Sequence, residues 1–152
     1  MSKSYQNIMV PYDGSTYSQK ALKMAIKMAS AFDSSIYLVN VLDITTVSPP
    51  GGHIWSKDTR KTLDQIKNSI KTSTESYLKK MQKDYKDSGI MIKGFVLEGD
   101  VAGKLLKFIQ DNDIELVIIG SRGLSGISKI MTLGSVSRKV SELAKCPVMI
   151  IH

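Results

Sequence analysis

The chain has 152 residues and a formal net charge of +7, with 42% apolar and 23% charged side chains. This length fits a single domain over 1–152 that buries enough apolar surface to fold without a disulfide or a structural metal. The longest apolar runs are too short to cross a bilayer, and the one cysteine, Cys146, excludes an internal disulfide framework. The N-terminus lacks a signal-peptide layout, so we expect a cytoplasmic protein without a membrane partner.

Positive charge is concentrated in one segment. Residues 57–88 hold nine Lys and Arg against five Asp and Glu, so this segment supplies four of the seven net charges. No aromatic residues alternate with these cations, as a surface for single-stranded nucleic acid requires. We therefore expect a solvated helix face. Nucleic-acid binding through 57–88 stays the less favoured alternative, and it would show a steep salt dependence.

The apolar pattern starts with a strand and then takes a helical period. A short apolar run predicts a strand over 7–12, and the turn-forming letters DGS follow it. Thr16 and Gln19 have the spacing of a capping box. Small and apolar side chains then recur at helical spacing, which predicts a helix over 16–32.

A β-branched run predicts a second strand over 34–43. A loop with two prolines and two glycines follows at 44–56. Gly89 suits the left-handed stop of the next helix. That helix, amphipathic and long, is predicted over 57–87 from apolar residues three, four and seven apart: Leu63, Ile66, Ile70, Tyr77, Leu78 and Met81.

The last third of the chain repeats the alternation. A strand over 114–120 is nearly all apolar, as expected when both faces of a sheet are covered. Pro147 blocks extension of the last helix, predicted over 134–145. The elements in order are a strand over 90–99, a helix that Asp100 can cap and that turns Leu105, Leu106 and Ile109 inward, the strand over 114–120, a helix over 134–145 and a strand over 148–151.

Strict alternation of strands and helices predicts an α/β fold with a parallel sheet covered by helices on both faces. Right-handed crossovers make it a doubly wound, Rossmann-like sheet of five strands in the order 3-2-1-4-5. In such sheets ligands bind beyond the carboxyl ends of the strands, where the strand order reverses. The loops after strands one and four should therefore face each other across a crevice.

The loop after strand four suits an anion. Gly120 and Gly123 allow the backbone to approach a ligand closely, because no Cβ intervenes. Gly134 begins a helix whose first N–H groups lack internal partners and attract negative charge. Ser135 and Ser137 add hydroxyl donors there.

Charged side chains near the two loops complete a possible nucleotide site. Arg122 and Lys129 can neutralise phosphates, and Asp13 can accept hydrogen bonds from sugar hydroxyls or a base amine. Plainer interpretations stay open: the glycines form an ordinary turn, Asp13 only starts a helix, and Arg122 is a solvated cation. His53 and His152 have no third ligand beside them, so no metal site is predicted. Trp55 covers the crevice or packs on a partner.

Six segments carry a family resemblance: IMVPYDGS, IYLVNVLD, GDVAGKLLKFI, LVIIGSRGLSG, LGSVSRKV and CPVMII. Together they resemble the ATP-binding branch of the universal stress protein family, and the resemblance covers essentially the whole chain. The glycine motif of that branch is G-x2-G-x9-G-[ST]. Gly120 to Gly123 fits its first part and Gly134-Ser135 its last, with ten residues between them in place of nine. We expect the extra residue to bulge within SGISKIMTL.

The resemblance implies a bound adenine nucleotide, ATP or else ADP or AMP, with Mg²⁺ possible on the phosphates. Pro11 and Asp13 would border adenine and ribose, and Val41 would cover the base. It also implies a homodimer through the C-terminal strand, VMII. The candidate binding residues are Pro11, Tyr12, Asp13, Ser15, Val41, Gly120, Ser121, Arg122, Gly123, Gly134, Ser135, Val136 and Ser137.

The leading hypothesis is a nucleotide-binding regulator in which the ligand orders the loops at 43–56 and 121–133 and so alters a surface seen by a protein partner yet to be identified. A slow ATPase is an alternative, although the G-x4-G-K-[ST] loop is missing and no general base is evident, so no catalytic residue is predicted. A dimeric stress protein that acts without nucleotide is the third hypothesis.

Overall fold

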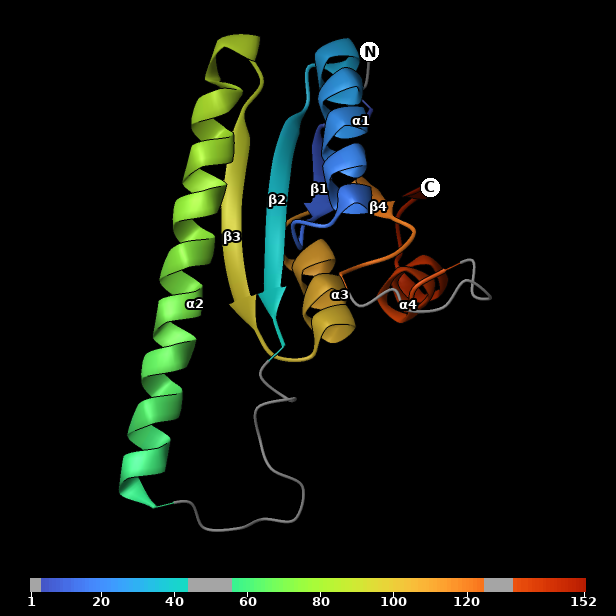
Figure 1. The fold of residues 1–152 in the computed structure, drawn as a ribbon. Helices are drawn as coiled ribbons and strands as arrows, with labels where there is room; N and C mark the ends of the chain where they lie inside the picture. Colours follow the sequence, from blue (N-terminus) through green and yellow to red (C-terminus); the bar gives the residue numbers. More distant parts are fainter. Residues whose placement is uncertain (1–3, 44–55, 125–132) are drawn as a thin grey trace.

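The computed structural model describes residues 4–43, 56–124 and 133–152. Five strands form one parallel sheet in the order β3-β2-β1-β4-β5, with helices on both faces (Figure 1), so the predicted doubly wound fold is confirmed. Among the described helices, none combines the length and apolar character needed to cross a membrane. The elements are β1 (Asn7–Pro11), α1 (Thr16–Phe32), β2 (Ser35–Leu42), α2 (Lys57–Asp84), a 3-10 turn (Lys86–Ser88), β3 (Ile92–Glu98), α3 (Val101–Asp111), β4 (Leu116–Gly120), α4 (Ser135–Leu143) and β5 (Val148–Ile151).

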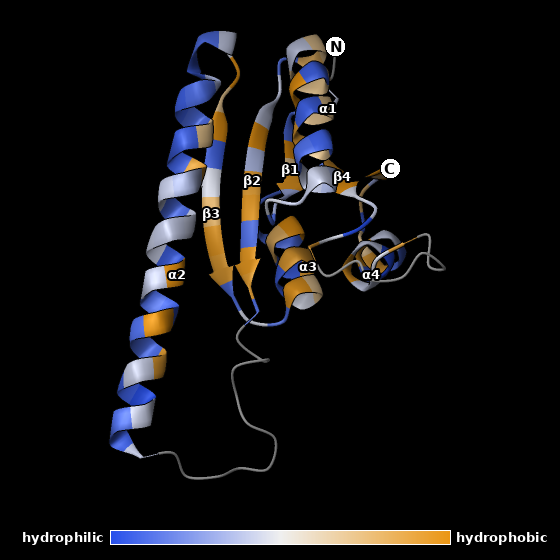
Figure 2. Ribbon diagram, in the orientation of Figure 1, coloured by the Kyte–Doolittle hydropathy of each residue, from blue (hydrophilic) through white to orange (hydrophobic). Residues whose placement is uncertain are grey.

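The sheet separates two apolar layers. Ile8 and Val10 of β1 point into the layer under α1 and α2, whereas Met9 between them points into the layer under α3 and α4. All three side chains are fully buried. This alternation is the period of two that a strand covered on both faces requires. Figure 2 shows apolar residues concentrated on the strands and on the helix sides that face them.

The start of α1 differs from the prediction. Ser15, and not Thr16, is the N-cap: its hydroxyl accepts a hydrogen bond from the Ser18 N–H at 3.1 Å. The Gln19 side chain donates to the Gly14 carbonyl at 3.1 Å, so the predicted capping box between Thr16 and Gln19 is wrong. The cap lies one residue earlier than predicted because Gly14, with φ of +82°, turns the chain so that Ser15 stands just before the helix.

Helix α2 runs along β3 in a regular antiparallel arrangement. Gln82 donates to the Ile92 carbonyl at 2.8 Å, and further along Lys71 lies 3.7 Å from the Glu98 carboxylate. Between these contacts the Leu78 side chain packs over Gly94, where a Cβ would lie 3.1 Å from the Leu78 Cβ. Glycine at this point of β3 therefore lets the helix approach the sheet closely.

The amphipathic face predicted for 57–87 is buried at one residue of the described helix, Leu78. Ile66 and Ile70 stay about half exposed, at 49% and 48%. The helix ends at Asp84, and Gly89, with φ of +73°, terminates the 3-10 turn that follows. The glycine stop is confirmed, but the helix itself is three residues shorter than the predicted 57–87.

The first four strands are one to three residues shorter than predicted, whereas the fifth has the predicted bounds, 148–151. The last helix spans Ser135–Leu143 rather than 134–145. Tyr12 and Ile114 lie just outside their strands yet are only 3% and 5% exposed. Apolar character therefore continues past the point where the hydrogen-bonded ladder stops. In α3, Leu105 and Ile109 are buried as predicted, whereas Leu106 is half-buried.

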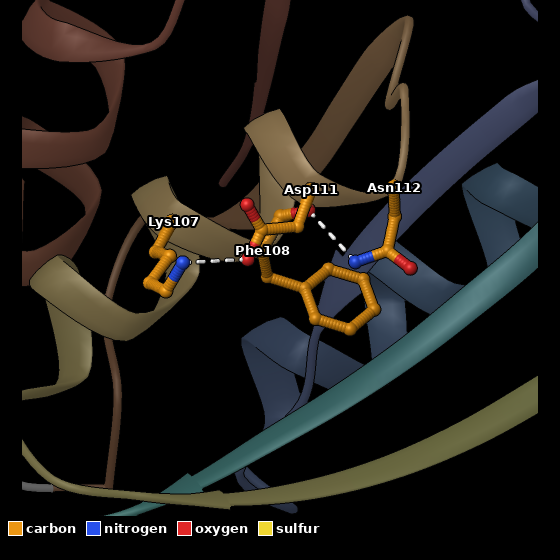
Figure 3. A network of polar contacts seen from close by, with 4 residues as sticks. All are labelled: Lys107, Phe108, Asp111 and Asn112. Atoms are coloured by element: carbon orange, nitrogen blue, oxygen red, sulfur yellow. Dashed lines mark hydrogen bonds and ion pairs between the residues drawn. The ribbon is translucent and has the colours of Figure 1, made fainter.

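Side chains hold both ends of α3. Asp100 accepts from the Gly103 N–H at 2.8 Å, which confirms the predicted cap. At the other end the Asn112 amide donates to the Phe108 carbonyl at 3.0 Å, and Lys107 lies 2.8 Å from the Asp111 carboxylate (Figure 3). The Asp100 and Asn112 contacts satisfy backbone groups that a helix end leaves unpaired. The packing of α3 on the sheet comes from its buried Leu105, Phe108 and Ile109 side chains.

Candidate functional site

A cavity of about 630 Å³ lies at the carboxyl edge of the sheet, where the loops that follow β1 and β4 meet. Its wall includes the ends of three strands and the first turns of α3 and α4. This is the position predicted from the topology, the point where strand order reverses. Eleven of the thirteen residues predicted for the site line the cavity: Pro11, Tyr12, Asp13, Val41, Gly120, Arg122, Gly123, Gly134, Ser135, Val136 and Ser137.

The other two predicted residues, Ser15 and Ser121, lie behind the wall. Ser15 caps α1 and is 6% exposed. Ser121 is 1% exposed, and its N–H donates to the Ile151 carbonyl at 2.7 Å. Both shape the loops instead of facing the cavity.

The first loop is held by backbone and side-chain bonds to β2. The Tyr12 N–H donates to the Val39 carbonyl at 2.8 Å, and the Asn40 side chain donates to the Tyr12 carbonyl at 2.7 Å. The chain then turns at Gly14. As a result the Asp13 side chain projects towards the second loop.

The carboxylate of Asp13 joins the two loops. Its Oδ1 accepts from the Ser15 N–H at 2.9 Å, and its Oδ2 accepts from the Leu124 N–H at 3.1 Å. A Cβ on Gly123 would lie 2.8 Å from the same Oδ2. A side chain at position 123 would therefore push the carboxylate away from the Leu124 N–H, and glycine leaves room for this contact.

The second loop returns to its starting point through hydrogen bonds. The Gly134 N–H donates to the Ser121 carbonyl at 2.7 Å, and the buried Ser137 hydroxyl donates to the Gly120 carbonyl at 2.7 Å. Gly120 also packs tightly on α1, because a Cβ there would lie 2.7 Å from the Tyr17 carbonyl carbon. These contacts fix the N-terminus of α4 at the cavity.

Helix α4 offers backbone donors to the cavity. Gly134 is its N-cap, in extended conformation, and no side chain caps the helix. The N–H groups of the first turn therefore lack the oxygen partner that a serine or aspartate cap supplies. Arg122, half-buried, lines the same cavity. The arrangement suits an anion at this end.

One wall of the cavity is apolar, and sequence reasoning found only part of it. Val39 lines the cavity beside the predicted Val41, two positions away on the same face of β2. Val101 and Leu105, four apart in the first turns of α3, extend this wall. The sequence could have indicated these residues. Val39 shares the strand face of the predicted Val41, and Val101 and Leu105 share one face of the helix that Asp100 caps. Further lining residues outside the prediction are Ser18, Asp43, Ile119, Leu124 and Leu133.

The Tyr12 side chain points away from this apolar wall into the layer under α1 and α2. Its hydroxyl lies 2.7 Å from the Tyr77 hydroxyl, and the two rings stack at 5.7 Å. Burial of Tyr12, with a further contribution from the Tyr77 hydrogen bond, raises the pKa of its phenol well above the usual value. Tyr12 therefore stays neutral and links the first loop to α2.

Several residues named in the sequence analysis lie outside the described parts of the chain. They are His53 and Trp55 in the loop after β2, and Lys129 in the loop after β4. The expected bulge in SGISKIMTL falls in the same region. Across residues 4–43, 56–124 and 133–152, no three His, Cys, Asp or Glu side chains group as metal ligands.

The whole chain matches proteins of one family. The model of the universal stress protein family matches residues 4–152. Universal stress protein MJ0531 of Methanocaldococcus jannaschii is 32% identical over 97% of this chain and 82% of its own length. YxiE of Bacillus subtilis is 30% identical over 97% of this chain and 99% of its own. The structure of UspA from Lactobacillus plantarum has a TM-score of 0.83 at 20% identity, covering 98% of this chain and 99% of that one.

Two further structures of similar fold contain adenine nucleotides. A universal stress protein in complex with cAMP has a TM-score of 0.67 at 21% identity, covering 98% of each chain. A family protein of Arabidopsis thaliana with AMP bound has a TM-score of 0.66 at 20% identity, covering 96% of this chain and 90% of that one. With the family model matching almost every residue and two curated relatives at 30% identity or more, the chain belongs to the universal stress protein family.

Proposed function

We propose that this protein binds an adenine nucleotide in the cavity between the loops after β1 and β4, and that it acts as a regulatory binding module. The observation that carries the proposal is the uncapped N-terminus of α4 opposite an apolar wall within one cavity of about 630 Å³. A nucleotide needs both surfaces, one for the base and one for the phosphates. Relatives of the same fold bind cAMP and AMP, which supports the choice of adenine.

In this proposal the base lies against Val39 and Val41, and the sugar lies near Asp13. The phosphates lie at the first turn of α4 and beside Arg122. The Asp13 carboxylate already accepts two backbone hydrogen bonds. Since an ionised carboxylate has about four lone-pair positions, it keeps capacity for a sugar hydroxyl.

The number of phosphates on the bound nucleotide is a separate part of the proposal, based on the glycine motif. The motif implies ATP, with Mg²⁺ on its phosphates, whereas two relatives of known structure hold cAMP and AMP. Titration calorimetry with ATP, ADP and AMP, each with and without Mg²⁺, measures the preference directly. A higher affinity for ATP that depends on Mg²⁺ would support the triphosphate.

The substitution Gly134→Ala tests the site. Gly134 has φ of −67°, and a Cβ there would come no closer than 3.5 Å to the Ser121 carbonyl oxygen, so alanine fits the unliganded fold. The added methyl group would stand where a phosphate approaches the helix. We expect affinity to fall at least tenfold, about 1.4 kcal/mol. The matched control is Glu142→Ala, on the exposed side of the same helix. Equal affinity in wild type and Gly134→Ala would contradict the assignment.

We also propose a homodimer through β5. This strand pairs with β4 on one side, and within the described residues no strand pairs with its other side. Its four residues, Val148–Ile151, are all apolar and half-buried. An apolar strand with a free edge favours pairing with a second chain.

A further inference from the structure

The first half of α2 extends beyond the sheet. The contact between Lys71 and Glu98 lies at the last residue of β3. Since α2 runs antiparallel to β3, residues 57–70 continue past the carboxyl edge, as Figure 1 shows. At 1.5 Å per residue this projecting part is roughly 20 Å long. That length equals nearly four turns of helix.

An apolar row continues along the projecting part. Leu63 is half-buried, and Ile66 and Ile70 are 49% and 48% exposed. Their spacings of three and four place them on one side of α2. Since each residue turns a helix by roughly 100°, this side lies about a quarter turn away from Leu78, the residue that packs against β3. Figure 2 shows apolar positions on α2 beyond the end of β3. We refer to Leu63, Ile66 and Ile70 as the overhang row. A contiguous apolar row of this kind on a surface helix indicates a site of interaction.

The charges beside the overhang row are mostly positive. Residues 57–71 hold five Lys and Arg against two Asp. Arg60 and Lys67 lie one turn before and one turn after Leu63, on the same flank of the row. Within the described parts of the chain, neither forms an ion pair, whereas Lys71 pairs with Glu98. An occupant of this face therefore needs negative charge beside its apolar contacts.

We propose that the overhang row and its basic flank dock an amphipathic helix of a protein partner that carries acidic residues beside its apolar face. An amphipathic helix that docks on such a face makes its contacts through apolar side chains at positions i, i+3, i+4 and i+7. The roughly 20 Å of projecting helix matches three to four turns of a partner helix. The proposal is independent of nucleotide binding.

Two other occupants fit less well. In a pair of α2 helices from two copies, each basic flank would meet another basic flank, and like charges repel. A helix that lies in a membrane interface buries a broad apolar face, whereas residues 57–71 hold only three apolar side chains, Leu63, Ile66 and Ile70.

The experiment is a selection from a phage-displayed library of 18-residue helical peptides on the full-length protein. We expect enriched sequences with apolar residues at helical spacing and flanking Asp or Glu. For a peptide made from the consensus, Ile66→Asp with Ile70→Asp should weaken binding at least tenfold. The matched control is Asn68→Asp with Thr72→Asp, which adds the same charges to exposed positions on the opposite face. Circular dichroism checks that both variants are folded.

Charge reversal provides the second measurement. In Arg60→Glu with Lys67→Glu, the acidic peptide should lose affinity at least tenfold, and a version with Lys in place of its acidic residues should gain it. No enrichment, enrichment of basic or uncharged sequences, or equal loss in both Asp variants would overturn the proposal. An oligomer in sedimentation that is lost in Ile66→Asp with Ile70→Asp would also overturn it, because it assigns the row to a second copy. Binding to vesicles with anionic lipid that is lost in the same variant would overturn it too, because it assigns the row to a membrane.

Discussion

Asp13 and Leu124, 111 positions apart, are joined by a hydrogen bond of 3.1 Å from the Leu124 N–H to Asp13 Oδ2. The other oxygen of the same carboxylate accepts from the Ser15 N–H. One side chain therefore connects the start of α1 to the loop after β4, across the mouth of the cavity. This carboxylate is therefore one of the contacts that hold the second loop, beside the hydrogen bonds of Gly134 and Ser137.

Asp13→Asn should loosen the second loop. The amide keeps one acceptor oxygen and places an N–H₂ group where the carboxylate had its other oxygen. One of the two backbone donors then loses its partner, at a cost of about 1–3 kcal/mol for a bond to a charged group. Amide hydrogen exchange at Leu124 should speed up, and nucleotide affinity should fall. Asp87→Asn, at an exposed position of the 3-10 turn, is the control. Unchanged exchange at Leu124 would contradict the linking role.

Gly123→Ala should differ from Gly134→Ala before any nucleotide is added. A Cβ at position 123 would collide with Asp13 Oδ2 at 2.8 Å, whereas at position 134 the nearest atom is 3.5 Å away. We expect Gly123→Ala to separate the two loops and to lower the unfolding midpoint in urea. Gly134→Ala should leave that midpoint nearly unchanged. Similar midpoints for the two variants would argue against the close contact at Gly123.

The hydroxyl pair of Tyr12 and Tyr77 should respond asymmetrically to substitution. Tyr12 is 3% exposed and Tyr77 is 40% exposed. Tyr77→Phe leaves the buried Tyr12 hydroxyl without its partner and should cost about 1–3 kcal/mol. Tyr12→Phe removes the buried hydroxyl, and Tyr77 can turn to water, so the loss should be about 1 kcal/mol or less. Urea unfolding at pH 7 measures both, and an equal loss would contradict the burial difference.

The same pair predicts a loss of stability in alkali. Burial raises the pKa of Tyr12 above its ordinary value of 10.0. Above that value the unfolded chain releases the phenolic proton while the folded protein retains it, so stability falls as pH rises. The stabilisation is complete below pH 10 and is lost as the pH rises towards the raised pKa. Tyr12→Phe should show a shallower decline than wild type between about pH 9.5 and 11, and an unchanged slope would exclude Tyr12 as its source.

Ile150→Pro should prevent pairing through β5 without breaking the sheet inside one chain. The Val117 and Ser121 N–H groups bond to the carbonyls of Pro147 and Ile151, so odd-numbered residues of β5 point to β4. The Ile150 N–H then points to the free edge, because alternate residues of a strand bond to opposite sides. Sedimentation should show a dimer for wild type and Ile150→Ala, and a monomer for Ile150→Pro. A proline variant that stays dimeric would place the interface elsewhere.

Ser15→Ala should destabilise the protein by about 1 kcal/mol, the usual cost of losing an N-cap oxygen. Thr16→Ala should have little effect, since Thr16 is exposed and its hydroxyl does not cap α1. Thermal unfolding of the two variants compares them directly. A larger loss for Thr16→Ala would restore the capping box expected from the sequence.

Local rules predicted the ends of elements well where one residue decides them. Asp100 caps α3 because its carboxylate reaches an N–H three residues ahead. Gly89 adopts a positive φ that other residues avoid. At α1 two neighbouring hydroxyls could act as caps, and the turn at Gly14 decided for Ser15. The sequence pattern alone does not show which of the two neighbouring hydroxyl residues caps the helix.

The features that local rules did not predict depend on packing between segments that are far apart in the chain. The apolar spacing of 57–87 predicted an amphipathic helix, but not that β3 ends at the level of Lys71 and leaves Ile66 and Ile70 exposed. In the same way, the glycines after β4 suggested an anion site, whereas Val101 and Leu105 joined the cavity through the packing of α3. Such partners come from distant segments, so their spacing in the chain carries little information.

The sequence by itself determined the order of strands and helices, the parallel sheet and the pair of loops at its carboxyl edge, because periodicity, caps and crossover handedness are local or topological properties. Only the tertiary structure decided that Asp13 bonds to Leu124, that Ser15 and Ser121 lie behind the cavity wall, and that half of α2 projects past the sheet. Those features depend on where the backbones come to lie within a few ångströms of one another, and that distance is fixed by the packing of the whole molecule.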